Sequence, residues 1–389
     1  MQDRSITPPS PHQKLEENEE KGRYSNKKKK KSTNTSSPYS PYKFTTSKPR
    51  SPSKKYDVIA LSRITEVDGE NDGDNEQDDD DLHEDDIGLM SDDDLNTHFH
   101  TLSQNFSVTA DASFFESEFS VISNLGSGHF AIVWHVIHHQ SGIYFAVKRL
   151  KSPYSSFPER WRQLVEVRHM FLVQQSKHCI KIQRAWEQKG FLYLQLELAV
   201  ASLQDYMNQQ NQVTSDETLL NILYEIALGL KDIHDANVIH LDLKPSNIMI
   251  DANGRLKIGD FGTSVQWPLV ETEFKGEGDK KYMAPDILNS KATKAADIFS
   301  LGLIMLELAS HTVLPMDGDE WDLLRISDFK QEDSDYVIHS NVMSHLISRM
   351  LTIHPKQRIT IDDLLNTPAM KQRNNNNNGA LIEFIHNNY

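Results

Sequence analysis

Two short motifs hold the residues whose types and spacing best suit group-transfer chemistry: HLDLKPSN, which begins at His240, and DFG, which begins at Asp260. Asp242 in the first motif could accept the proton of an attacking hydroxyl group, and Lys244 could neutralise charge on a transferring phosphoryl group. Asn247 and Asp260 offer the hard oxygen ligands that Mg²⁺ prefers. The complete ordered set predicts phosphoryl transfer.

A glycine-rich segment, Gly126-Ser127-Gly128, lies between two stretches with strand-like composition. Because glycine has no side chain, such a hairpin lets the backbone approach phosphate groups closely, and Val133 in the second strand would cover an adenine ring. The setting differs from the strand-to-helix turn of a dinucleotide fingerprint. The segment therefore predicts a phosphate-binding hairpin, although glycines here also suit an ordinary turn.

Lys148 ends an apolar stretch that begins at Phe145. A charge at such a position requires partners, because burying an unpaired ammonium group is costly. Phosphate groups on one side and the carboxylate of Glu166, in the predicted helix over 161–173, on the other would supply them. We therefore expect Lys148 and Glu166 to form an ion pair.

The elements that position these residues follow from a hydrophobic pattern that persists from residue 119 to about residue 370. Strands rich in Val, Ile, Phe and Trp are predicted over 119–125, 131–138 and 144–150. Later segments have helical spacing, and the capping-box pattern Thr214-x-x-Glu217 precedes one of them. A stretch of about 250 residues can hold one two-lobed unit or two small domains.

The regions on either side have a different composition. Residues 1–118 lack apolar periodicity and are rich in Ser, Thr, Pro, Lys, Asp and Glu, which predicts a disordered regulatory tail. Five consecutive lysines, from Lys27 to Lys31, make its first part basic, and sixteen acidic residues between Glu66 and Asp94 make its second part acidic. Residues 371–389, which include a run of asparagines, are predicted to be a polar extension.

Composition limits the classes of function. The net charge of −15 argues against nucleic acid as a partner. One cysteine, Cys179, cannot form an internal disulfide, and we find no apolar run of about 18 residues and no leader. We expect a soluble intracellular protein without a membrane span. The run from Lys27 to Lys31 could bind a nuclear import receptor, or be an ordinary solvated charge run.

With these motifs in order, the sequence resembles the eukaryotic protein kinase superfamily over residues 119–370. The resemblance implies an α+β, bilobal protein kinase fold, with a small β-rich N-lobe and a larger helical C-lobe, that uses ATP and Mg²⁺. It implies catalytic roles for Asp242, Lys244, Lys148 and Glu166 and metal binding by Asn247 and Asp260. The residues it places around the nucleotide are Leu125, Gly126, Ser127, Gly128, Val133, Ala146, Lys148, Leu196, Glu197, Ala199 and Met249.

The same resemblance implies more specific roles for some of these residues. Glu197 and Ala199 would present backbone groups to adenine, Met249 would lie beneath the ring, and Leu196 would guard the back of the pocket. Asp297 is similar to the buried aspartate that braces the catalytic loop of kinases.

Three positions depart from the usual kinase pattern. Arg358 is similar to the arginine that pairs with the end of the activation segment, where Asp286 replaces a glutamate whose longer side chain reaches further. We expect the shorter side chain to reach Arg358 less well. The third glycine position of the glycine-rich loop is Ala131, and Leu241 replaces the arginine that normally precedes the catalytic aspartate.

Two features narrow the resemblance to one group of kinases: Leu241 and the end of the activation segment. The activation segment ends with EGDKKYMAPD, from Glu277 to Asp286, and together with Leu241 and the motif HLDLKPSN it resembles the Wee and Myt kinases. Those enzymes restrain mitotic entry by phosphorylating the glycine-rich loop of a cyclin-dependent kinase on tyrosine, or on neighbouring threonine and tyrosine. The resemblance implies a cyclin-dependent kinase–cyclin complex as the protein substrate. Without that arginine, no cation is placed beside Asp242 to capture an activation-loop phosphate, so such phosphorylation should not be needed for activity.

Within that group, the retained DFG motif and the sequence Met283-Ala284-Pro285 favour the Myt branch. Animal Myt kinases carry a membrane-anchoring segment after the kinase domain, whereas only a short polar-rich stretch follows Met370 here. We therefore expect a nuclear enzyme, with a cytoplasmic one as the alternative.

Two other functions remain open. Lys244 is usual for serine/threonine kinases, so the residues alone favour serine or threonine as the acceptor, and an active kinase with another substrate, such as one in a stress response, is the main alternative. A pseudokinase scaffold is suggested only by Ala131, Leu241 and Asp286. None of these three changes removes a catalytic group, which favours an active enzyme.

Overall fold

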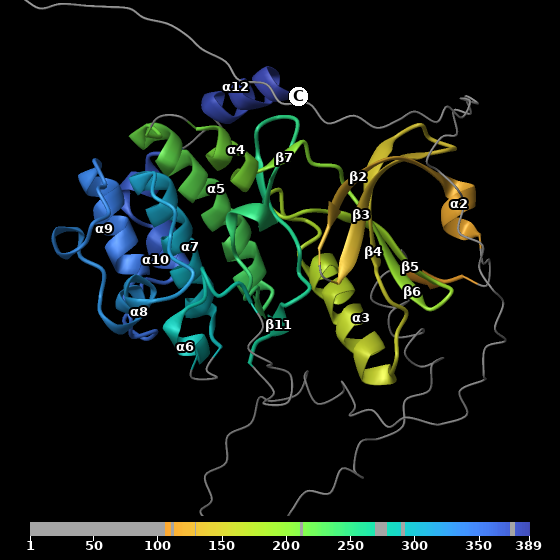
Figure 1. The fold of residues 1–389 in the computed structure, drawn as a ribbon, viewed down its shortest axis with the longest axis horizontal. Coiled ribbons are helices and arrows are strands. Elements are labelled where there is room, and N and C mark those ends of the chain that lie inside the picture. The colour runs from red at the N-terminus through yellow and green to blue at the C-terminus, as the bar shows by residue number, and fades with distance from the viewer. Residues whose placement is uncertain are drawn as a thin grey trace, which may run out of the picture. The chain divides into compact units, whose positions relative to one another are not determined.

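The computed structural model describes residues 106–109, 113–128, 130–210, 213–268, 278–288, 292–373 and 378–389. Most of the predicted tail, including Lys27 to Lys31 and the acidic stretch, lies outside the described residues, and so do His129 and Glu277. The described part has a β-sheet lobe and a helical lobe (Figure 1). The predicted α+β, bilobal fold is therefore confirmed.

The N-lobe is a six-stranded sheet with the strand order β1-β5-β6-β4-β3-β2. All neighbours pair antiparallel except β1 and β5, which pair parallel. The strands are β1 (Phe106–Val108), β2 (Phe119–Ser127), β3 (Ala131–His138), β4 (Tyr144–Leu150), β5 (Ile182–Gln188) and β6 (Phe191–Leu196). The three strands predicted from composition thus correspond to β2, β3 and β4.

An aromatic cluster covers one face of this sheet. The short helix α2 (Phe114–Glu118) brings Phe115 against Phe119, Trp134 and Tyr193, with ring centroids 5.4 to 5.8 Å apart. Such offset and tilted aromatic pairs stabilise beyond the area that they bury. Strand β1 and helix α2 therefore belong to the folded lobe, so the predicted tail boundary at residue 118 is wrong for 106–109 and 113–118.

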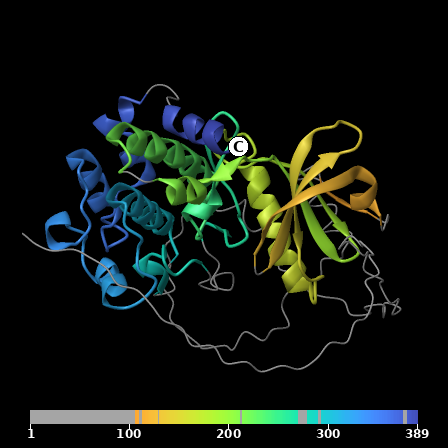
Figure 2. The same ribbon diagram turned by 45° about the horizontal axis from the view of Figure 1, so that its top comes forward.

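Helix α3 (Phe157–Leu172) lies between the sheet and the helical lobe in both views (Figures 1 and 2). The side chain of Ser156 caps its start by accepting a hydrogen bond from the backbone N–H of Glu159. The predicted helix began at residue 161, because apolar periodicity appears only after this first turn. Leu164, Val167 and Met170 are buried and pack the helix onto the sheet lobe.

The C-lobe is mainly helical. Its helices are α4 (Leu203–Gln209), α5 (Asp216–Asp235), α6 (Pro285–Leu288), α7 (Lys294–Ser310), α8 (Asp319–Ile326), α9 (Asn341–Met350), α10 (Ile361–Leu365), α11 (Pro368–Lys371) and α12 (Gly379–Asn388), with the 3₁₀ turns η2 (Pro245–Asn247) and η3 (Gln331–Asp333). The C-lobe also has two small sheets, with the strand orders β10-β9-β7 and β11-β8. Their strands are β7 (Ala201–Ser202), β8 (Val238–Ile239), β9 (Ile248–Ile250), β10 (Leu256–Ile258) and β11 (Val265–Gln266).

The N-cap of helix α5 lies one residue after the predicted N-cap. Ser215, rather than Thr214, accepts the hydrogen bond from the backbone N–H of Thr218. Both residues have the hydroxyl group that suits an N-cap, so the motif alone does not separate adjacent candidates. The apolar residues at helical spacing, such as Leu219, Leu223 and Leu230, are buried as predicted.

The chain after residue 371 is part of the folded lobe, which corrects the prediction of a polar extension. Leu381, Phe384 and Ile385 of α12 are buried, and the Phe384 ring packs edge-to-face against Tyr206 of α4, with centroids 5.4 Å apart. The Asn378 side chain donates hydrogen bonds to the Glu225 carboxylate and to the Gly254 carbonyl, each over 2.8 Å. Of the asparagine run, residues 374–377 lie outside the described residues.

Candidate functional site

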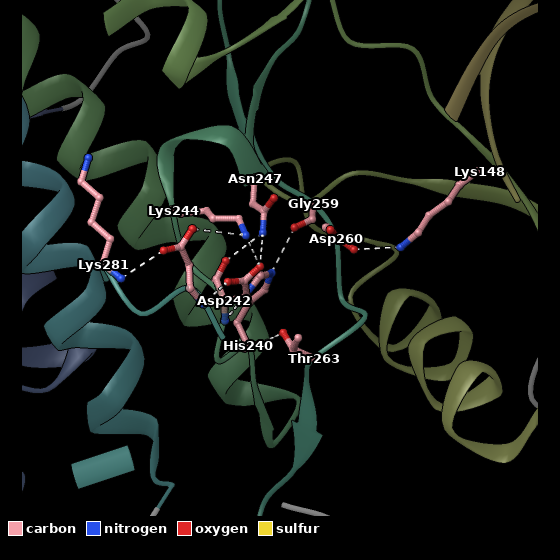
Figure 3. A network of polar contacts seen from close by, with 10 residues as sticks. Lys148, His240, Asp242, Lys244, Asn247, Gly259, Asp260, Thr263 and Lys281 are labelled. Carbon is pink, nitrogen blue, oxygen red and sulfur yellow. Dashed lines mark hydrogen bonds and ion pairs between the residues drawn. The ribbon is translucent and has the colours of Figure 1, made fainter. Parts of the chain in front are cut away.

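Lys148 on β4 connects the two lobes at the centre of the candidate site. Its Nζ atom lies 2.6 Å from Oε1 of Glu166 on α3. The same atom lies 2.8 Å from Oδ1 of Asp260, and Figure 3 shows this contact. The ion pair between Lys148 and Glu166 that the sequence predicted is therefore present. The second carboxylate comes from the other lobe, so one ammonium group fixes α3, β4 and the DFG motif relative to one another.

The charges in this triad shift one another's pKa values. Burial alone would lower the pKa of Lys148, but the carboxylates of Glu166 and Asp260 hold it above its ordinary value. The Lys148 ammonium lowers the pKa of Asp260 to about 2, against the effect of burial. Burial raises the pKa of Glu166, and Lys148 opposes that shift. Lys148 and Asp260 are therefore both charged at neutral pH.

The catalytic-loop motif lies between β8 and η2, where a buried aspartate holds its backbone. Asp297 on α7 accepts hydrogen bonds from the backbone N–H groups of His240 and Leu241, each over 2.9 Å. Nε2 of His234 lies at the same distance from its Oδ2 atom. These contacts confirm the predicted bracing role of Asp297. They also stabilise Leu241 at a φ of 65°, a conformation that is costly for a residue with a β-carbon.

The carboxylate of Asp242 receives three hydrogen-bond donors (Figure 3). Nδ2 of Asn247 lies 2.9 Å and Nζ of Lys244 2.7 Å from Oδ2, while the backbone N–H of Asp279 donates to Oδ1 over 2.9 Å. Charge-assisted hydrogen bonds of this kind are short and directional. The Asp242 carboxylate is thus held in place by the catalytic loop and by the activation segment.

Asp279 also acts on the second cation of the site. Its Oδ2 atom lies 3.7 Å from Nζ of Lys244, so the ammonium group is shared between the carboxylates of Asp242 and Asp279. Burial would lower the pKa of Lys244, but these acids raise it overall. Gly278 touches the same loop, because a β-carbon there would lie 2.7 Å from the Leu241 carbonyl oxygen. The sequence did not predict a role for the Asp279 side chain or for this close approach.

The two candidate metal ligands fit a divalent cation by their chemistry. The amide nitrogen of Asn247 donates to the Asp242 carbonyl over 2.8 Å and to the Asp242 carboxylate over 2.9 Å. The amide oxygen of Asn247 therefore remains for a metal. The Asp260 side chain is 48% exposed, so its carboxylate is accessible. Mg²⁺ commonly uses one or two such protein oxygens and completes its shell with phosphate and water. No group of three His, Cys, Asp or Glu side chains suited to a metal occurs among the described residues.

The DFG motif is held by the catalytic loop and by α3. Phe261 is fully buried and packs edge-to-face on the His240 ring, with centroids 5.1 Å apart, while Nε2 of His240 lies 3.1 Å from the Gly259 carbonyl. Nδ1 of His169 on α3 lies 2.8 Å from Oγ of Ser264. This second link between α3 and the segment after the DFG motif was not predicted.

The residues predicted to surround the nucleotide lie along neighbouring strands of the N-lobe and in the connection after β6. Ala146 on β4 is paired with Leu196 at the end of β6, and Val133 on β3 is paired with Lys148. The backbone N–H of Glu197 donates to the Lys181 carbonyl over 3.0 Å, and its carboxylate binds Nζ of Lys257. Ala199 follows in the same connection, Met249 lies on β9, and Leu125, Gly126 and Ser127 lie on β2, followed by Gly128.

Asp286 reaches Arg358 in spite of its shorter side chain, which corrects the sequence expectation. Oδ1 of Asp286 lies 2.9 Å from Nη2 of Arg358, and both side chains are buried. The other nitrogens of Arg358 donate to the carbonyls of Thr352 and Ala295, each over 2.7 Å. The end of the activation segment is therefore firmly bound to the C-lobe.

A second buried arginine, Arg325 on α8, holds the segment just before this pair. Its guanidinium group donates to the carbonyls of Lys280, Lys281 and Met283 over 2.8 to 3.3 Å and stacks on the Trp321 ring. Burial lowers the pKa of Arg325 to about 10. Nothing in the sequence around α8 indicated this role, because Arg325 lies far along the chain from the carbonyls that it binds.

Comparison with known proteins agrees with this geometry. Residues 119–370 match the family model described as the protein kinase domain. The chain is 37% identical over 284 residues to the mitosis inhibitor protein kinase wee1 of Schizosaccharomyces pombe, covering 67% of this chain and 32% of that protein. It is 36% identical over 264 residues to the membrane-associated tyrosine- and threonine-specific cdc2-inhibitory kinase of Drosophila melanogaster, covering 68% and 49%.

A probable protein kinase of Dictyostelium discoideum is 34% identical over 259 residues, covering 64% of this chain and 72% of that protein. The chain spans about a third to a half of the length of the wee1 and Drosophila relatives. Within the described residues, no helix is both long and apolar enough to cross a membrane. The predicted resemblance to Wee and Myt kinases is confirmed, and the chain belongs to the protein kinase domain family.

Proposed function

We propose that this protein is an active kinase that transfers the γ-phosphoryl group of ATP to the glycine-rich loop of a cyclin-dependent kinase and thereby inhibits it. The observation that carries the activity is the triad of Lys148, Glu166 and Asp260, formed together with a hydrogen-bonded Asp242. The two relatives named as mitosis inhibitor and cdc2-inhibitory kinases support the choice of target.

In this proposal each charged residue has one task. Lys148, oriented by Glu166, binds the ATP phosphates, and the glycine-rich turn from Gly126 to Gly128 covers them. Asp242 orients the acceptor hydroxyl and takes its proton, while Lys244 stabilises charge on the group in transfer. Preorganisation lowers the barrier because these groups need not reorient when charge develops.

Asn247 and Asp260 would hold the divalent metal, which we propose to be Mg²⁺. When bound, it neutralises charge on the ATP phosphates and orients them. Asp260 can serve this ion and Lys148 together, since Lys148 occupies only its Oδ1 atom in the contacts found here. The low pKa of Asp260 keeps the ligand ionised.

We propose tyrosine as the main acceptor, with the neighbouring threonine as a second one. The phosphate would add about two negative charges where the target must bind its own ATP phosphates. We further propose that the enzyme acts in the nucleus and that an import receptor binds the run from Lys27 to Lys31. Mutation of these five lysines to glutamine should then shift a fluorescently tagged chain to the cytoplasm.

The test uses the full chain, Mg²⁺, ATP and a catalytically inactive cyclin-dependent kinase bound to cyclin, followed by mass spectrometry of the target's glycine-rich loop. Phosphotyrosine that is absent with the Asp242→Asn variant supports the proposal. Transfer to a generic substrate but not to this loop would contradict the target and favour a kinase with another substrate. No transfer to any substrate would contradict the activity and favour the scaffold.

A further inference from the structure

Helix α8 has one face that is committed to the activation segment. Trp321 and Arg325 are buried, and besides the three carbonyl contacts of Arg325, Nε1 of Trp321 donates to the Lys280 carbonyl over 3.0 Å. These contacts hold residues 280–283, which directly follow Asp279. The backbone N–H of Asp279 in turn donates to the Asp242 carboxylate. Residues 279–283 therefore connect α8 to the proposed proton acceptor.

The opposite face of α8 is unusual for a solvent-facing surface. Asp319, Asp322, Leu323 and Ile326 have the spacing i, i+3, i+4 and i+7, which places them on one stripe of the helix. Leu323 is 50% and Ile326 74% exposed. Two branched aliphatic side chains beside two carboxylates are typical of a contact surface rather than of a purely solvated helix.

The chain around this stripe is strongly acidic and has further exposed apolar side chains. Met316 just before α8 is 66% exposed, and Val337 after η3 is 58% exposed. The one exposed lysine between residues 311 and 340 is Lys330. The exposed acidic residues in the same range are Asp317, Asp319, Glu320, Asp322, Asp328, Glu332, Asp333 and Asp335.

Beside Lys281 and Tyr282 of the activation segment, the acidic side chain already has partners within the chain. Glu307 on α7 is buried, and it binds Nζ of Lys281 through Oε1 and the hydroxyl of Tyr282 through Oε2, each over 2.6 Å. The chain's own lysine therefore neutralises an acid that could otherwise attract a basic residue of a substrate. Between residues 311 and 340, by contrast, eight acidic side chains on and beside α8 are exposed.

We propose that the outward stripe of α8, formed by Asp319, Asp322, Leu323 and Ile326, docks the folded protein substrate through a surface that carries basic side chains around an aliphatic contact. The inference rests on the proposed function, because it assigns how that substrate is recruited. Charge complementarity selects the partner: eight exposed acids against one lysine attract a basic surface and repel an acidic one.

Docking at this stripe would also position the acceptor. The buried face of α8 is bonded to residues 280–283, so a substrate held by the outward face has a defined place relative to Asp242. Such positioning acts on a folded substrate that reaches both places and is lost for a short peptide that reaches only Asp242. Recognition of a three-dimensional surface would then supply the specificity that a few residues around the acceptor cannot.

The test compares two substrates and three variants of the full chain. Ile326→Lys and Asp319→Lys place positive charge on the stripe, while the matched control Val342→Lys places it on α9, at an apolar residue that is 47% exposed. KM and kcat are measured with the inactive cyclin-dependent kinase–cyclin complex and with a short tyrosine peptide from its glycine-rich loop. Circular dichroism and the thermal midpoint confirm folding of each variant.

We expect each stripe variant to raise KM for the complex about tenfold, a change that corresponds to about 1.4 kcal/mol, with an unchanged peptide KM. Val342→Lys should leave both values within about twofold, since charge changes away from an interface contribute little. KM for the complex should also rise with salt in the wild type, because exposed charges are screened.

Three results would overturn the docking proposal. The first is an unchanged KM for the complex in a folded stripe variant, and the second is an equal loss with the peptide, which would show that the stripe acts only on the activation segment. The third is a gain of activity in Ile326→Lys that disappears when Lys27 to Lys31 are changed to glutamine, because the chain's own basic segment would then occupy the stripe. Failure of the wild type to phosphorylate the complex would instead contradict the proposed function, and the docking proposal would fall with it.

Discussion

The backbone N–H of Asp279 donates a hydrogen bond to the carboxylate of Asp242 over 2.9 Å, and thus joins the end of the activation segment to the catalytic-loop motif. The Asp279 side chain extends the link, because it lies 3.7 Å from Nζ of Lys244 and accepts the backbone N–H of Lys281 over 3.0 Å. Asp279 therefore bonds the activation segment directly to Asp242 and lies near Lys244.

Asp279→Asn tests the carboxylate in this link. The amide keeps an oxygen for the Lys281 N–H but removes the negative charge beside Lys244. Asp242 is then the strongest of the acids that remain around this ammonium group. We expect kcat to fall about three- to tenfold, because a more tightly paired Asp242 is a weaker proton acceptor. Steady-state kinetics check this, with Asp216→Asn at an exposed position of α5 as the control. An unchanged kcat would show that only the backbone of residue 279 matters.

Lys148→Arg and Asp260→Asn test the triad between the lobes. Arginine keeps the charge but not the compact ammonium group that fits 2.6 and 2.8 Å from two carboxylates, and asparagine removes a charged metal ligand. We expect each variant to lose about 100-fold or more in turnover while its thermal midpoint stays close to that of the wild type. Full activity in either folded variant would refute the proposed role of that residue.

We predict that activation-loop phosphorylation is unnecessary because Leu241 stands in place of an arginine. Its side chain packs against the core at the position where an arginine would face a phosphate, and its backbone is held by Asp297. We expect protein treated with phosphatase to keep its full rate of substrate phosphorylation. The same phosphatase should abolish the phosphate signal on the kinase in mass spectrometry. A large loss of activity after this treatment would contradict the prediction and require a different cationic group.

Phe384 and Asn378 test whether α12 stabilises the C-lobe. Phe384→Ala removes a buried ring that contacts Tyr206, and we expect a loss of about 3 kcal/mol in unfolding free energy. Asn378→Ala leaves the Glu225 carboxylate without one of its donors and should cost about 1 to 3 kcal/mol. Denaturant unfolding measures both, with Glu383→Ala at an exposed position of α12 as the control. Wild-type stability in both variants would mean that α12 does not pack as described.

His169 should make stability depend on pH. Burial lowers its pKa to about 3, with a further contribution from the charge of Arg168, whereas the unfolded chain has the ordinary value of 6.5. Between these values the unfolded state binds an additional proton, so the histidine stabilises the fold fully above pH 6.5 and progressively less as pH falls. The expected slope is up to about 1.4 kcal/mol per pH unit.

The variant His169→Asn isolates this slope, because the amide can keep the contact with Ser264 but does not titrate. Unfolding free energies of both proteins are compared between pH 6.5 and pH 4.5, and other titrating groups cancel in the difference. Equal slopes would show that His169 does not titrate between the two states.

The sequence predicted the part of the site that consists of contiguous motifs. Asp242, Lys244 and Asn247 fall on one tight loop, and their spacing alone brings them together. Strands β2 to β4 could also be predicted, because β-branched and aromatic residues fill them. Lys148 and Glu166 were paired through the physical cost of a buried charge.

Contacts between distant segments were not accessible in this way. Arg325 lies in a stretch that resembles any amphipathic helix, and its carbonyl partners have no side-chain signature. The apolar residues of α12 fill only about three turns after a run of asparagines, too short a pattern to distinguish from a polar extension. Asp286 was judged by its length alone, whereas the backbone places it close enough to Arg358.

Strand β1 has a consequence for the N-lobe beyond packing. An open sheet edge is a template on which another chain can add a strand. The three residues of β1 cover Ala185, Trp186 and Glu187 of β5, and the Thr109 N–H continues the ladder by bonding to the Glu187 carbonyl. On this side of the sheet, the short strand β1 therefore covers part of the β5 edge, and it comes from a segment that precedes the family match, while β2 forms the opposite edge.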